Sequence, residues 1–279
     1  MRMKVLITVK AYPALSKKYN ETVCTAGITE EGKWIRIYPI PFRQLDYDNQ
    51  FSKYEWVELD LIRNTSDFRP ESFRPKDLLL KDLVSHGIVE SDGDAWIERR
   101  KIVLNKVYTN LKTLIQEAKS KSICTSLAVF KPTRIVDFIY EEVEREYKKD
   151  KLDHFNSKKL QLSFFNNEEE FDITEFELVN KLPYKFSFVF EDDEGKRSTL
   201  MIEDWETGML YWHSLERHEG DEFKACGDVK KKYFDDFAKT KDYYFFLGTT
   251  KLNHYVAPNP FVIIGDFRPK HISQENLFN

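Results

Sequence analysis

A short stretch near the N-terminus alternates apolar side chains with flat or charged ones. In a strand, Ile35 and Ile37 point to one side, and Trp34, Arg36 and Tyr38 point to the other. Two aromatic rings and a guanidinium on one face suit base stacking and phosphate binding. The alternative is that a helix covers this face and that Arg36 pairs with a glutamate of a neighbouring strand. With similar residues nearby, the predicted nucleic-acid-binding set is Lys18, Trp34, Arg36, Tyr38, Arg43, Arg69, Phe73 and Arg74.

A second group of residues could hold a divalent metal ion. The acidic turn at 191–196 ends in Glu-Gly-Lys, which matches the Glu-x-Lys part of a nuclease motif. In such a site, carboxylates on a rigid strand hold an ion that activates water. Asp204 also fits the first turn of a helix, where the helix dipole favours carboxylates. The candidate catalytic set is Glu191, Asp192, Glu194, Lys196, Glu203 and Asp204, and Mg²⁺ is required only in this alternative.

His254 is a further catalytic candidate. It lies in the thirteen-residue segment 248–260, between two apolar strands, and loops tied to rigid strands often carry function. The alternative is an ordinary polar surface loop. The sequence contains no Gly-x-Gly-x-x-Gly, Walker loop, Gly-x-Ser-x-Gly or paired Cys-x-x-Cys. We therefore expect no resident metal and no other cofactor.

The elements that would position these residues predict an α+β fold. Period-two patterns predict antiparallel strands in the first sixty residues, with a tight turn at Gly32. Apolar stripes at three- and four-residue steps predict helices over 104–118 and 132–147, and two more begin near Trp205 and Asp221. The expected organisation is an antiparallel, barrel-like module at 1–76, a helical segment at 77–150, an acidic linker or insertion at 151–180, and an α+β half at 181–279 that can share one core with the barrel.

Charge and cysteine usage narrow the class of protein. The 279 residues contain 43 Lys/Arg and 47 Asp/Glu, a net charge of −4, so no global field indicates nucleic acid or membrane. Residues 1–76 contain 13 basic against 10 acidic residues, whereas 137–180 contain 13 acidic against 6 basic ones. The three scattered cysteines fit a reducing compartment. We expect a cytoplasmic protein with no signal peptide and no membrane partner.

Two sequence stretches resemble an uncharacterised bacterial protein family of similar length. They are Val23-Cys24-Thr25-Ala26-Gly27 running through 34–41, and 246–250 together with Ala257-Pro258-Asn259-Pro260-Phe261. The resemblance covers most of the chain and implies one evolutionary unit. It also implies a link to mobile elements and anti-phage defence. It brings no activity, cofactor or catalytic residue.

The leading hypothesis is a protein that binds nucleic acid or a nucleotide. One alternative is a metal-dependent nuclease or other hydrolase that uses the acidic residues near 191–204. The other is a protein-interaction subunit of a larger complex, with the acidic stretch 137–180 as its docking surface. The sequence leaves open the choice among DNA, RNA and a small nucleotide, as well as the oligomeric state.

Overall fold

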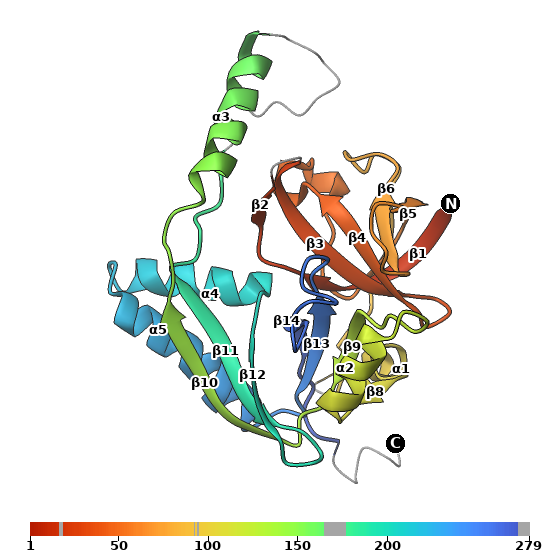
Figure 1. Cartoon of the computed structure of the whole chain (residues 1–279), viewed down its shortest axis with the longest axis vertical. Helices are drawn as coiled ribbons and strands as arrows, with labels where there is room; N and C mark the ends of the chain where they lie inside the picture. Colours follow the sequence, from red (N-terminus) through yellow and green to blue (C-terminus); the bar gives the residue numbers. More distant parts are fainter. Residues whose placement is uncertain (17–18, 92, 94, 165–176, 273–279) are drawn as a thin grey trace.

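The computed structural model describes residues 1–16, 19–91, 93, 95–164 and 177–272, with the backbone alone at 158–164. With 24% helix and 37% strand, it confirms the α+β class and the barrel-like N-terminal sheet. Figure 1 shows the barrel beside a second, helix-backed sheet. In the part of the chain that is described, no helix has the length and apolar character needed to cross a bilayer.

Five strands of the N-terminal region form a closed barrel. Around the barrel, each strand pairs with the next, and the last pairs with the first; β4 and β6 are parallel, and the other pairs are antiparallel. In chain order these are the first, second, third, fifth and fourth strands, which is the connectivity of the OB-fold, a five-stranded Greek-key barrel. The strands are β1 (Arg2–Lys10), β3 (Asn20–Thr29), β4 (Trp34–Ile40), β6 (Ser72–Pro75) and β5 (Glu55–Arg63).

The barrel encloses its own apolar core. Val5, Ile35, Ile37 and Leu59 are buried inside it, so the inward side of β4 is the isoleucine side that the sequence predicted. Gly32 has a φ of +72° in the turn between β3 and β4, as a tight turn requires. The smaller elements of this region are β2 (Ala14–Ser16), η1 (Phe42–Gln44), η2 (Tyr47–Asn49), β7 (Val84–Ile88) and α1 (Ile97–Val103).

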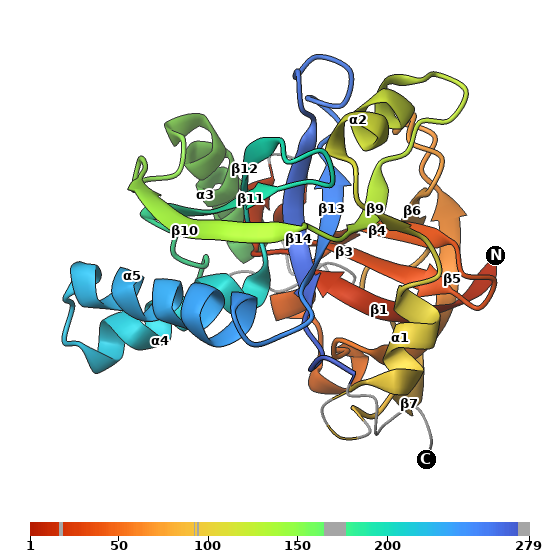
Figure 2. The same ribbon diagram turned by 90° about the horizontal axis from the view of Figure 1, so that it is seen from below.

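A second sheet carries the helices of the C-terminal half. One face packs against two helices and a π-helical segment (Figure 2). Phe138, Phe188 and Tyr233 meet in the core between them. The helix that connects β10 to β11 extends away from the body of the molecule (Figure 1). The elements are β10 (Arg134–Glu142), α3 (Lys149–Phe164), β11 (Tyr184–Glu191), β12 (Arg197–Met201), α4 (Trp205–Arg217), α5 (Glu222–Lys230) and η3 (Lys231–Ala238).

A third sheet covers the outside of the barrel. Ala26 and Ile28 of the barrel pack with Val129, Phe246 and other residues of this sheet in one buried cluster. The two ends of the chain therefore share apolar core. In pairing order, the sheet consists of β14 (Phe261–Phe267), β13 (Tyr244–Thr249), β9 (Leu127–Phe130) and β8 (Val107–Tyr108), with α2 (Leu111–Lys119) between the last two in sequence.

Two predicted helices were wrong. The stripe at 104–118 is divided, because Val107–Tyr108 pair with β9, and Asn110 caps a helix that begins at Leu111. The segment 132–147 contains the strand β10 instead of a helix. A register irregularity between Ile135 and Asp137 adds a residue to β10, so its apolar side chains recur at a helix-like spacing.

Candidate functional site

The outward face of β4 is largely covered by the C-terminal half. Arg36 is 3% exposed, and its Nη1 and Nη2 atoms donate to the Oγ and carbonyl oxygen of Ser126, at 3.2 and 3.3 Å. The indole of Trp34 meets the ring of Phe246 edge-on at 5.6 Å and stays half-buried. Tyr38 lies further along the strand, where its hydroxyl accepts from Thr22. The three predicted residues share a face, but they do not form one open row.

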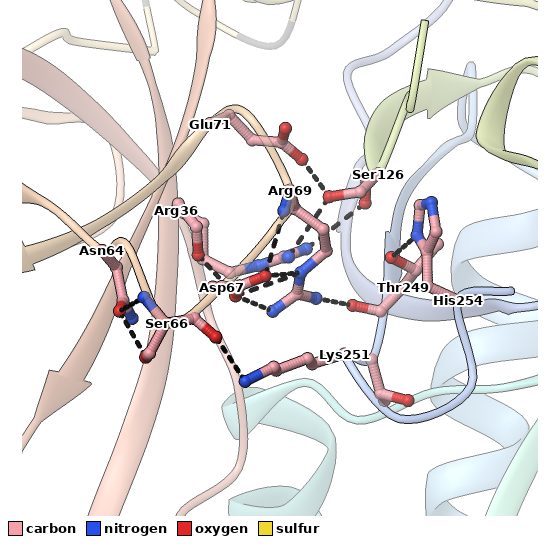
Figure 3. Close-up of polar contacts among 12 residues, drawn as sticks. Arg36, Asn64, Ser66, Asp67, Arg69, Glu71, Ser126, Thr249, Lys251 and His254 are labelled. Carbon is pink, nitrogen blue, oxygen red and sulfur yellow. Dashed lines mark hydrogen bonds and ion pairs between the residues drawn. The ribbon is translucent and has the colours of Figure 1, made fainter. Parts of the chain in front are cut away.

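Arg69 joins the barrel to the C-terminal half. It lies in the loop 64–71 between β5 and β6, and its Nε and Nη2 atoms bind the Asp67 carboxylate at 2.9 and 2.5 Å. Its Nη1 atom donates to the carbonyl oxygen of Thr249 (Figure 3). Burial opposes ionisation of Asp67, but hydrogen bonds from Arg69 and Ser72 outweigh it and hold the pKa of this carboxyl well below its usual range. We call this contact, with the Arg36–Ser126 pair, the seam.

The loop 64–71 is held rigidly at the seam. Arg63 donates to three of its carbonyl oxygens, those of Asn64, Asp67 and Arg69 at 2.8, 3.1 and 2.8 Å, and to the carbonyl oxygen of Ser72 at the start of β6. Glu71 accepts a hydrogen bond from Ser126 Oγ (Figure 3). The loop therefore presents a fixed surface to its surroundings.

His254 is fully buried at the C-terminal side of the seam. Its Nε2 atom lies 2.7 Å from the carbonyl oxygen of Ala118, which can only accept, so Nε2 carries the proton. Its Nδ1 atom then accepts from Thr249 Oγ1 at 2.8 Å. Burial lowers the pKa of His254 and so disfavours the protonated ring. Cys124 Sγ is 3.5 Å from Nε2, but this nitrogen already donates to a carbonyl oxygen and is no base for the thiol. In this arrangement, His254 links Thr249 to the carbonyl oxygen of Ala118.

Two adjoining cavities open beside Trp34. One has a volume of about 600 Å³ and lies against the β3–β4 turn and the start of β1; the other, of about 250 Å³, lies against residues 123–128. Trp34, Pro70 and Glu71 line both cavities, which together we call the Trp34 groove. The charged side chains around it are Arg2, Lys4, Lys33 and Lys106 against Glu30, Glu31 and Glu71.

Sequence reasoning missed the lysines of this groove. Lys33 precedes Trp34 at the turn, a signal that could have been used. Lys106 lies far away in sequence, and only the packing of the two halves brings it to the smaller cavity.

The other residues predicted to bind nucleic acid are dispersed. Arg43 pairs with Glu21 at 2.8 Å, and Phe73 packs at the edge of the barrel core. Arg74 is exposed, and Lys18 lies outside the described residues.

The acidic turn after β11 does not gather its carboxylates. Glu191 forms ion pairs with Arg134 and Arg197, at 2.9 and 3.1 Å. Asp192 is buried and accepts from the backbone N–H groups of Glu194 and Lys196, which closes the turn. The side chains of Glu194 and Lys196 are exposed. Within residues that the structure describes, no three His, Cys, Asp or Glu side chains are placed to hold a metal ion.

Asp204 and Glu203 have different surroundings. Asp204 is buried, caps α4 by accepting from the Glu206 N–H at 3.0 Å, and pairs with Lys53 at 2.7 Å. Glu203 is half-buried beside a different groove, and burial raises its pKa. The two neighbouring carboxylates are thus not joined in one metal site.

The structure defines a two-part α+β protein, in which a closed barrel and a helix-backed half meet at a buried seam. The chain belongs to the family described as "Domain of unknown function (DUF8757)", whose model matches residues 107–279. Residues 1–105 match a second model, "Domain of unknown function (DUF8758)". The boundary falls between α1 and β8, so the seam joins residues from both matched regions.

No curated protein matches the chain. One solved structure that aligns with it is entitled "Structure of murine DNA binding protein bound with ds DNA". It is 9% identical, and the alignment covers 98% of this chain and 97% of that chain with a TM-score of 0.29. A TM-score this low supports no argument about fold or function.

Proposed function

We propose that this protein binds single-stranded nucleic acid in the Trp34 groove. The observation that carries the proposal is a half-buried indole in the wall shared by two cavities, beside the loop between the fourth and fifth barrel strands. In OB-folds, the face of the second and third strands and the adjoining loops bind oligonucleotides. Here most of that face is covered, which leaves its edge at Trp34 for a ligand. A fold alone assigns no function, so the proposal depends on this groove.

The groove offers two kinds of contact to a strand. A base that has left its stack can lie on the Trp34 ring, and such stacking is worth about 1–3 kcal/mol per base. Lys33 and Lys106 can pair with phosphates, which releases counterions and makes the affinity depend on salt. A base within a duplex is not available for this stacking, so we expect single strands to bind more tightly than duplexes.

Charge reversal at the groove tests the proposal. We expect wild-type protein to bind labelled single-stranded oligonucleotides with an affinity that falls as salt rises, and Lys33→Glu/Lys106→Glu to lose about tenfold or more of this affinity. The matched control is Lys196→Glu/Lys231→Glu, which changes the same charge at two exposed positions outside the groove. Fluorescence anisotropy at two salt concentrations measures both. Equal loss in the two variants, or no salt dependence, contradicts the proposal.

Trp34→Phe tests the stacking contact separately. Phenylalanine keeps a ring against Phe246 but offers a smaller surface to a base, so we expect several-fold weaker binding with an unchanged salt slope. Trp96→Phe is the control, because Trp96 packs on Tyr54 and Phe267 away from the groove. If Trp34→Phe and Trp34→Ala both bind with wild-type affinity, the Trp34 indole is not part of the binding site.

A further inference from the structure

A second groove lies between the barrel and the helix-backed sheet, apart from the Trp34 groove. Its volume is about 650 Å³, within the range of small-molecule sites. Residues 12–15, which run into β2, form one wall. The start of β11, the end of β12 and the start of α3 form the others. Both family-model regions therefore contribute to it, and we call it the Tyr12 groove.

Three tyrosines line this groove with their hydroxyl groups already bound. The Tyr12 hydroxyl donates to the carbonyl oxygen of Asn180 at 2.8 Å and accepts from the Trp212 indole at 2.7 Å. The hydroxyl groups of Tyr147 and Tyr184 donate to the Val179 carbonyl oxygen and the Glu222 carboxylate, at 3.0 and 2.8 Å. These bonds fix the rings as rigid apolar walls, which a flat ligand can contact without ordering them first.

Glu203 lines the same groove and lacks a partner. In the described part of the chain, its carboxylate has no hydrogen bond and no ion pair, and burial alone raises its pKa. Two buried carboxylates elsewhere in the protein are paired with cations, Asp67 with Arg69 and Asp204 with Lys53. A half-buried carboxylate without donors loses part of its hydration and gains no protein donor in exchange, so it is free to accept hydrogen bonds from a ligand.

Four lysines line the groove, and three of them are bound to other groups: Lys151 to the Leu15 carbonyl oxygen, Lys181 to that of Glu146, and Lys185 to the Glu141 carboxylate. Lys148, Lys151, Lys181 and Lys185 outnumber the lining carboxylates of Glu144 and Glu203. Lys148 is exposed at the beginning of α3, where a ligand anion can reach its ammonium group. The groove thus combines apolar walls, an acceptor and an accessible cation at Lys148.

We propose that the Tyr12 groove binds a guanine nucleotide, with the base against the tyrosine walls, the two adjacent N–H donors of guanine on Glu203, and the phosphate at Lys148. Guanine is the base that fits, because its Watson–Crick edge presents N1–H and N2–H side by side. Adenine and cytosine have an acceptor nitrogen next to their amino group. This nitrogen would repel a carboxylate oxygen, because both are hydrogen-bond acceptors. This groove is independent of the Trp34 groove, so either proposal can fail alone.

Calorimetry with the full chain tests the assignment. We expect GMP to bind about tenfold or more tightly than IMP, which lacks the N2 amino group, and than AMP. Glu203→Gln should weaken GMP binding by a similar factor, because an amide donor replaces half of the acceptor. Glu144→Gln, at the other carboxylate of the groove, should bind GMP like the wild type. Since Glu203→Gln removes an unpartnered charge, its melting temperature should not fall.

The guanine could belong to a free nucleotide or to a base of a bound strand, and a second arm separates these sources. A single-stranded oligonucleotide with one guanine is compared with the same oligonucleotide carrying inosine. A guanine preference that Glu203→Gln abolishes, without GMP binding, assigns the groove to a base of a strand. The proposal is overturned if GMP and AMP bind equally, or if Glu203→Gln binds GMP as the wild type does. It is also overturned if GMP does not bind and the oligonucleotides show no guanine preference. GMP binding that survives Lys33→Glu/Lys106→Glu shows that the two grooves act separately.

Discussion

The ammonium group of Lys53 lies 2.7 Å from the Oδ1 atom of Asp204, across the contact between the barrel and the C-terminal half. Glu206 is 3.3 Å from the same ammonium group, and Arg268 is 2.8 Å from Glu206. Charges of alternating sign therefore join the segment before β5 to the start of α4 and to the residue that follows β14. The contact between the halves is polar here, in addition to the shared apolar cluster.

Asp204→Asn should remove a contribution to stability that declines as pH rises in mildly acidic solution. Burial raises the pKa of Asp204 from 3.8 to about 6, although Lys53 opposes this shift. Between these values the folded state holds a proton that the unfolded state has released, so the free energy of unfolding falls as pH rises. Asparagine keeps an oxygen for the helix cap and removes the titration. Urea unfolding at pH 4 and at pH 7 should show that, as pH rises, the free energy of unfolding changes less favourably in the wild type than in the variant, by up to about 3 kcal/mol.

Asp221→Asn is the matched control for this prediction. Asp221 caps α5 in the same way, but a hydrogen bond from the Lys224 N–H lowers its pKa. Its contribution to stability is therefore lost as pH falls, which is the opposite sign. A slope for Asp204→Asn that equals the wild-type slope would show that Asp204 does not titrate in this window.

Asp67→Asn should destabilise the protein strongly. The change leaves the buried guanidinium of Arg69 without its counter-charge, and breaking a buried pair in this way costs about 3–5 kcal/mol. Glu191→Gln breaks the more exposed pair with Arg134 and should cost much less, because water screens an exposed ion pair. Denaturant unfolding of both variants gives the comparison. Similar losses would mean that the Arg69 guanidinium finds another partner or reaches water.

His254→Gln should reduce the loss of stability at acidic pH. Burial lowers the pKa of His254 below 6.5, so the unfolded state takes up a proton before the folded state does. Stability from this group is therefore complete above about pH 6.5 and is lost as pH falls from that value toward the lower pKa of the folded state. His213→Gln changes an exposed histidine and serves as the control. Nitrogen NMR should find the His254 proton on Nε2, and a proton on Nδ1 would contradict the assigned hydrogen bonds.

Gly208→Ala should disturb the Tyr12 groove. A Cβ atom at this position of α4 would overlap the Tyr12 ring, so either the helix or the ring must move. Such overpacking costs about 1–3 kcal/mol. Gly227→Ala in α5 meets no atom within 4 Å and should stabilise the protein by about 0.5–1 kcal/mol. Thermal melts of the two variants should shift in opposite directions, and equal shifts would show that Tyr12 yields without cost.

The strands of the barrel were predictable because their sequence pattern follows the pleat directly. Ile35 and Ile37 alternate with polar or aromatic neighbours, and Gly32 permits the turn before them. The strand β10 was not predictable in this way. Its bulge after Ile135 breaks the alternation and leaves Phe138 at a helical spacing from Ile135.

The site was predictable only in part. The pattern placed Trp34, Arg36 and Tyr38 on one side of a strand, and it carried no information about what covers that side. The partner of Arg36 is Ser126, ninety residues later, and such a contact is fixed by tertiary packing. Likewise, Arg69 is engaged by Asp67 because the loop turns the two side chains toward each other.

Because the third sheet covers the outer face of the barrel, each of the two matched regions depends on the other for the burial of its apolar surface. A cleavage near residue 106 would leave Ala26 and Ile28 in water on one fragment, and Val129 and Phe246 in water on the other. Fragments with such exposed apolar surfaces aggregate or are degraded by proteases. A gene that encoded only one of the two regions would produce a protein with an exposed apolar face. We therefore expect selection to retain the two regions together.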